Sequence, residues 1–91
     1  MTFKMTEVDG LQPAELAGKL EEWKVRFEEY ATMAEEFRED EDPAWADAAD
    51  YAKNVNQLFV ETIPAVRSQG EGWEALRDEL YSDLTDIDLL S

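Results

Sequence analysis

The densest group of chemically active side chains is a run of carboxylates in the middle of the chain. Six of the eight residues from Glu35 to Asp42 are Asp or Glu. Carboxylates at this density can coordinate a hard cation such as Ca²⁺ or contact a basic protein surface. An EF-hand loop starting at Asp40 would need Gly at its sixth position and Glu at its twelfth, where the sequence has Trp45 and Tyr51. We therefore expect no EF-hand metal site, and we interpret the run as a solvated turn or a partner-binding surface.

The residue types that most enzyme mechanisms need are missing from the chain. It contains no His and no Cys, which removes the usual proton shuttle, the thiol nucleophile and the soft metal ligands. It also has no glycine-rich phosphate loop, no Glu-x-x-His di-metal motif and no Gly-x-Ser-x-Gly nucleophile elbow. We therefore expect a protein that is not an enzyme and has no catalytic residues, bound metal or cofactor.

The net charge of the chain narrows the choice of partner. With 23 Asp and Glu against eight Lys and Arg, the formal charge is −15. Such a chain repels phosphates, so we expect no direct binding to nucleic acid or to an anionic membrane. The natural complement is a basic surface of another protein. The acidity alternatively serves solubility or a salt-rich habitat.

Length and composition are those of one small folded domain. The chain has 91 residues, of which 44% are hydrophobic, enough to form a core, unlike a disordered acidic tail. No apolar run approaches the roughly 18 residues of a membrane span, and the first residues lack the apolar segment of a signal peptide. We therefore expect a cytoplasmic protein.

Apolar residues repeat with heptad spacing between residues 13 and 40. Intervals of four and three residues alternate, which places one apolar stripe on a helix and favours left-handed packing against another helix. Pro13 suits the first helical position, and Leu11 can pack on Leu16 as a hydrophobic staple. We interpret the stripe as core rather than as a ligand slot. It consists of Leu16, Leu20, Trp23, Phe27, Tyr30, Ala34 and Phe37.

A second helix is expected over residues 43–69. Asp42 and Pro43 suit its N-cap and first helical position. Alanines near its start would let the two helices approach closely. Pro64 lacks a backbone N–H and clashes with the preceding turn, so we expect a kink or break near Thr62 and Ile63. The apolar stripe of this helix consists of Ala44, Ala48, Tyr51, Ala52, Val55, Leu58, Phe59, Ile63 and Val66.

The two ends of the chain are less regular. Gly70 and Gly72 form a flexible joint before a short helix over residues 72–84. The tail, residues 85–91, mixes Asp with large aliphatic residues, which is typical of either packing of the last helix or a short docking motif. Residues 1–10 alternate in character and form either an extended arm or strand, or a disordered end. The apolar positions of the short helix are Trp73, Leu76, Leu80 and Leu84.

These patterns predict an all-α fold, a long antiparallel helical hairpin of two amphipathic helices plus a short C-terminal third helix, in a single acidic domain over residues 1–91. Two helices do not enclose so many aromatic residues, so we also expect a homodimer or a tightly folded-back third helix. If the chain turns back near Pro43, several carboxylates gather at one end of the hairpin. The candidate partner-binding residues are Glu35, Glu36, Glu39, Asp40, Asp42, Asp47 and Asp50.

The leading functional hypothesis is a small acidic protein-binding module that occludes a basic surface of its partner. Carboxylates arrayed along a hairpin can imitate the charge of a DNA backbone, so a nucleic-acid-binding partner is the best match. In size and charge the chain is similar to small acidic inhibitors encoded by phages and mobile elements. By that analogy it would act in anti-defence or host takeover.

The alternative hypothesis is a dimeric helical-hairpin structural adaptor, in which the heptads carry the function. In length, hairpin layout and low pI the chain resembles the small secreted ESAT-like proteins of type VII secretion, whose turn carries Trp-x-Gly. Here the turn reads Trp45-Ala46-Asp47, without the Gly. The C-terminal Tyr-x-x-x-Asp or Glu signal of that family is also unmatched, because Thr85 stands four residues after Tyr81.

Overall fold

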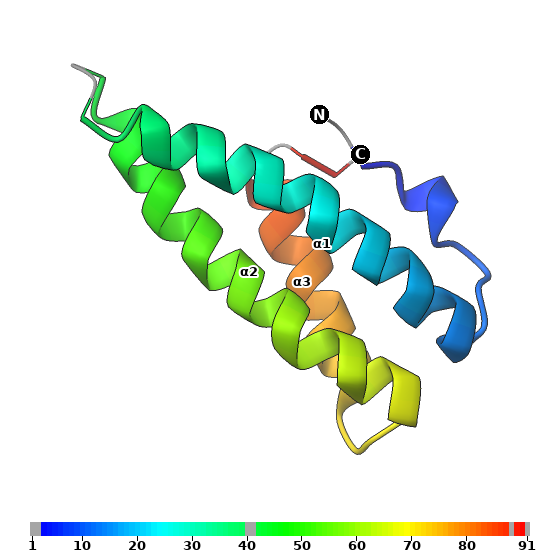
Figure 1. The fold of residues 1–91 in the computed structure, drawn as a ribbon. Helices are drawn as coiled ribbons and strands as arrows, with labels where there is room; N and C mark the ends of the chain where they lie inside the picture. The colour runs from blue at the N-terminus through cyan, green and yellow to red at the C-terminus, as the bar shows by residue number, and fades with distance from the viewer. Residues whose placement is uncertain (1–2, 40–41, 88, 91) are drawn as a thin grey trace.

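The computed structural model describes residues 3–39, 42–87 and 89–90. It contains three α-helices, α1 (Pro13–Glu36), α2 (Ala44–Ser68) and α3 (Trp73–Asp86), preceded by a short 3-10 helix, η1 (Met5–Glu7). Helices α1 and α2 form a long hairpin, and α3 packs on α2 (Figure 1). The expected all-α hairpin with a short third helix is confirmed, and the described residues contain no strand.

Helix α1 presents its heptad stripe to the core. Its buried residues include Leu16, Leu20, Trp23 and Phe27, none more than 4% exposed. The helix ends at Glu36, before the expected end at residue 40. Acidic side chains oppose the helix dipole at a C-terminus, which is consistent with this earlier end. Phe37, the last member of the expected stripe, therefore lies beyond the helix and is 43% exposed.

The buried stripe of helix α2 begins at Ala49 and not at Ala44 as expected. Ala49 and Ala52 are buried, whereas Ala44 is exposed and Ala48 is half-buried. The expectation that Ala44 belongs to the packed face is thus wrong, because the first turn of α2 lies at the open end of the hairpin. The small side chain of Ala52 stands in the same core cluster as Phe27 and Phe59, whose ring centroids are 5.6 Å apart.

Of the kink or break expected near Thr62 and Ile63, the break does not occur, since α2 continues without interruption through Pro64 to Ser68. Pro64 itself is exposed, while Ile63 and Val66 beside it are buried. The proline ring therefore removes one backbone hydrogen bond on the solvent side, while the residues beside it remain packed in the core.

The joint between α2 and α3 uses two left-handed residues. Gln69 has φ 52° and Gly72 has φ 81°. Gly72 is one of the two glycines expected to form the joint, and its lack of a side chain suits this conformation. The other, Gly70, donates its N–H to the carbonyl of Ala65 at 3.0 Å, which closes the end of α2.

The first and last described segments, at Phe3 and Leu90, lie side by side next to the hairpin (Figure 1). Phe3 forms an isolated parallel bridge with Leu90, and its N–H donates to the carbonyl of Leu89 at 2.6 Å. Phe3 is fully buried, and Leu89 and Leu90 are each 7% exposed. The arm is therefore packed rather than disordered, and the two leucines of the tail belong to the core instead of forming an exposed docking motif.

Candidate functional site

The turn between α1 and α2 carries the carboxylates predicted to bind a partner. Glu35 and Glu36 lie in the last turn of α1, Glu39 in the connecting turn, and Asp42 just before α2. Asp47 and Asp50 follow in the first two turns of α2. Asp40 lies outside the described residues. The fold thus brings the six described carboxylates to one end of the hairpin, which extends past α3 and the chain ends (Figure 1).

Two of these carboxylates are engaged by Arg38. Its guanidinium donates to Glu35 at 3.1 Å and also pairs with Asp50 on the facing helix. The hydrogen bond to Glu35 and the negative charge of Asp50 raise the pKa of Arg38. Arg38 therefore links the end of α1 to α2. Glu35 and Asp50 form ion pairs within the chain, so their charge is partly neutralised and less available to a partner. Sequence analysis assigned no role to Arg38.

Asp42 also has a structural task. Its Oδ1 accepts the N–H of Ala44 at 3.0 Å, and its carbonyl accepts the N–H of Trp45 at 3.3 Å. Asp42 thus supports the start of α2, but the N-cap residue of this helix is Pro43 and not Asp42, so the expected position of the cap is wrong by one residue. Trp45 packs in turn on Phe37, with ring centroids 5.2 Å apart, so an aromatic pair closes the hairpin end. The exposed carboxylates with neither an ion pair nor a side-chain hydrogen bond in the described part of the turn are Glu36, Glu39 and Asp47.

A feature that sequence analysis missed is a seven-residue repeat of glutamates along α1. Glu-Glu doublets occur at residues 21–22, 28–29 and 35–36. Seven residues make about two helical turns, so each series lines up along the helix with steps of about 10.5 Å. All of these residues are exposed. The acidic row consists of Glu15, Glu22, Glu29 and Glu36, and the paired column consists of Glu21, Glu28 and Glu35.

The two series differ in their charge partners. Every member of the paired column meets a cation: Glu21 pairs with Arg67, Glu28 with Lys24 at 2.9 Å, and Glu35 with Arg38. In the acidic row only Glu22 has an ion pair among the described residues, with Lys19 at 3.2 Å. The paired column therefore contributes ion pairs within the chain, whereas most carboxylates of the acidic row are exposed to solvent and have no neutralising cation among the described residues.

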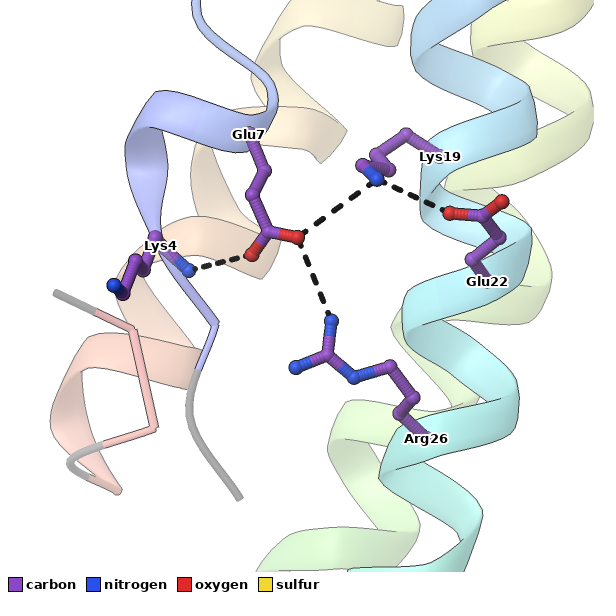
Figure 2. A network of polar contacts seen from close by, with 5 residues as sticks. All are labelled: Lys4, Glu7, Lys19, Glu22 and Arg26. Carbon is purple, nitrogen blue, oxygen red and sulfur yellow. Dashed lines mark hydrogen bonds and ion pairs between the residues drawn. The ribbon is translucent and has the colours of Figure 1, made fainter.

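Glu7 of the N-terminal arm engages the cations beside the acidic row. Its Oε1 lies 3.8 Å from Lys19 Nζ and 3.6 Å from Arg26 Nη1, and its Oε2 accepts the backbone N–H of Lys4 at 3.1 Å (Figure 2). The hydrogen bond from Lys4, together with the charges of Arg26 and Lys19, lowers the pKa of Glu7. The cations of this side of α1 thus hold the arm in place.

A third acidic surface lies on α3. Glu74, Asp78 and Glu79 are exposed there, and Asp78 pairs with Arg77 at 3.0 Å. On the side of α3 that meets α2, the hydroxyl of Tyr51 donates to Asp86 at 3.4 Å. Burial, followed by the charges of Asp83 and Asp86, raises the pKa of Tyr51 to about 12. The exposed Glu79 on this surface has no ion pair among the described residues and serves below as a control position for the acidic row.

Neither a metal site nor a known relative assigns a function to these surfaces. In the ranges that the structure describes, no group of three or more Asp and Glu is placed to hold a metal ion. Of the helices described, none is long and apolar enough to cross a membrane. No protein-family model, curated protein or solved structure matches the chain.

Proposed function

We propose that this chain is a small acidic binding module that occludes a basic surface of a partner protein. The contact surface is the acidic row of α1, Glu15, Glu22, Glu29 and Glu36, continued at the hairpin end by Glu39 and Asp47. The hairpin end projects past the rest of the fold (Figure 1), so a partner can reach it from several sides.

The contrast between the two glutamate series of α1 carries the proposal. The paired column has one cation for each carboxylate, as expected where charge serves the fold. Glu29 and Glu36 of the acidic row have none among the described residues, although the chain has Lys and Arg elsewhere. Like charges set in a line on one exposed face repel each other, and a basic partner removes that repulsion.

The chemistry of the partner follows from the same charges. A surface that accepts a row of carboxylates is lined by Lys and Arg, as nucleic-acid-binding surfaces are. The module would then compete with DNA or RNA for its partner without touching nucleic acid itself. Inhibitors of phages and mobile elements that act on nucleases or DNA-binding factors work in this way, and the proposal places the chain beside them by analogy.

The proposal is tested by capture from a lysate of the source cells on three immobilised baits. The first bait is the wild type. The second carries Glu29→Lys, Glu36→Lys and Glu39→Lys. Of these, Glu36→Lys places a cation in the last turn of α1, where the helix dipole favours positive charge. The third carries Glu61→Lys, Glu71→Lys and Glu79→Lys, which make the same change in net charge at three other exposed glutamates without ion pairs in the described part of the chain.

The expected result is a basic protein captured by the wild type and the third bait but not by the second. Circular dichroism on all three baits checks that helicity is equal. Loss of the same protein from the second and third baits alike would mean that net charge, and not the acidic row, governs the capture, and the proposal would be wrong.

The hairpin adaptor, including an ESAT-like secreted protein, is the second candidate. It is favoured by Val25 and Val60, which are 62% and 48% exposed and offer an apolar surface for assembly. An adaptor of this kind would keep its partners in the second bait and lose them when these valines are replaced.

A further inference from the structure

A long groove runs between α1 and α2, and α3 contributes no residue to its lining. It consists of two hollows in line, of about 600 Å³ and about 400 Å³. The first lies between Val25 of α1 and Val60 of α2, and the second between Ala31 of α1 and Ala49 of α2. On α1, Val25 lies on the side opposite Trp23, whose ring faces Tyr81 of α3.

The floor of the groove is apolar and open to solvent. Val25 is 62% exposed and Val60 is 48% exposed, the two highest values among the exposed large hydrophobic residues of the described chain. Ile63 and Pro64 extend this apolar area in the first hollow, and small alanines leave room in the second. Exposed aliphatic side chains beside a helix groove are typical of a surface that another helix covers.

The rim of the groove is electrically balanced, unlike the rest of the chain. Its carboxylates are the paired column on α1, and its cations are Lys24 on α1 and Lys53 and Arg67 on α2. Three negative and three positive charges leave the groove neutral in a chain of charge −15. The signs are also separated, because the α1 rim is net negative and the α2 rim is wholly positive.

We propose that this groove binds a second copy of the chain, about a two-fold axis parallel to the hairpin. That axis places α1 of each copy on α2 of the other, so each negative rim meets a positive rim. Because Glu21 and Arg67 stand at the same level of the hairpin, they would also stand at the same level across the interface. An axis across the hairpin would instead bring the two negative α1 rims together.

The size of the face is sufficient for a stable dimer. The molecule is 43 Å long, and two helices side by side are roughly 20 Å wide, so the face offers about 800 Å² per copy, the area of a standard interface. The acidic row lies outside the groove on α1 and remains exposed in both copies. The dimer therefore does not depend on the proposed function, and it would present two acidic rows.

The first test uses Val25→Glu, which adds a charge to the groove at a side chain that the fold does not bury. Ala75→Glu, on the exposed face of α3, is the matched control. Sedimentation equilibrium should give twice the 10.5 kDa monomer mass for the wild type and the control. The dissociation constant of Val25→Glu should rise at least about tenfold. A wild type that remains a 10.5 kDa monomer at millimolar concentration would overturn the proposal.

A charge exchange tests the orientation of the two copies. One variant carries Glu21→Lys and Glu28→Lys, which make the α1 rim positive, and the other carries Lys53→Glu and Arg67→Glu, which make the α2 rim negative. Exposed ion pairs of this kind contribute little to stability, so both variants should fold. Each alone should be monomeric, and an equimolar mixture should dimerise. A mixture that stays monomeric, or variants that dimerise alone, would contradict the proposed packing.

Discussion

The Phe3 ring lies on the indole of Trp23, with ring centroids 4.9 Å apart and both side chains fully buried. The guanidinium of Arg26 lies over the Phe3 ring at 4.7 Å from its centroid. The backbone of Phe3 is bridged to Leu90. One residue of the N-terminal arm thus joins α1 to the C-terminal tail and closes the core of a hairpin that would otherwise expose Trp23.

Replacing Phe3 by Ala should therefore lower the free energy of unfolding by about 3–5 kcal/mol, the usual cost of removing a buried Phe side chain. Urea unfolding followed by circular dichroism measures this difference. Met5→Ala is the control, because Met5 lies in the same arm and is 40% exposed. A Phe3→Ala variant as stable as Met5→Ala would show that the arm does not close the core.

The helices could be predicted from the sequence because their signals are local. The heptad spacing from Leu16 to Phe27 fixes the buried face of α1, and Asp42 with Pro43 marks the entry to α2. The arm could not be predicted, because the partners of Phe3 are Trp23 and Leu90, and contacts over such sequence distances leave no periodic pattern.

In the candidate site, too, the local features could be predicted from the sequence and the long-range contacts could not. The run of carboxylates around residue 39 was sufficient to predict that one end of the hairpin is acidic. The charge partners could not be assigned, since Arg38 meets Asp50 only when α2 folds back on α1. The doublet repeat that forms the acidic row is visible in the sequence and was open to prediction. Its separation from the paired column required the position of Arg67 on the facing helix.

Thr62 offers a test of the core of α2. It is fully buried, and its Oγ1 has no hydrogen-bond partner among the described residues. Thr62→Val keeps the shape and removes an unpaired polar group, so it should raise the free energy of unfolding by about 1 kcal/mol. The exposed Thr32→Val is the control and should change it by less than about 0.5 kcal/mol. A destabilised Thr62→Val would mean that the hydroxyl has a partner in solution.

Alkaline unfolding should report on Tyr51. The unfolded tyrosine loses its proton near pH 10, whereas the folded pKa is about 12. Between these values the unfolded chain binds fewer protons, so the stability of the fold should decrease as the pH rises above 10. Ultraviolet titration measures the ionisation, and Asp86→Asn should lower the pKa of Tyr51. An unchanged alkaline stability curve in Tyr51→Phe would contradict this assignment.

Salt should stabilise the fold, because the chain has 23 carboxylate side chains and only eight Lys and Arg to pair with them. Raising NaCl from about 0.1 M to about 1 M shortens the Debye length from about 10 Å to about 3 Å, which weakens repulsion between exposed charges. The Tm should rise, and it should rise less in the variant with Glu61→Lys, Glu71→Lys and Glu79→Lys. A Tm that falls with salt would mean that the ion pairs outweigh the repulsion.

The most direct measurement is the affinity of the captured partner for two purified variants with equal net charge. One has Lys at positions 29, 36 and 39, and the other has Lys at positions 61, 71 and 79. Isothermal titration calorimetry, with and without competing DNA, should give binding near the wild-type affinity for the second variant, reduced by DNA, and a loss of at least about a hundredfold for the first. Equal affinities for the two variants would contradict the assignment of the acidic row as the binding surface.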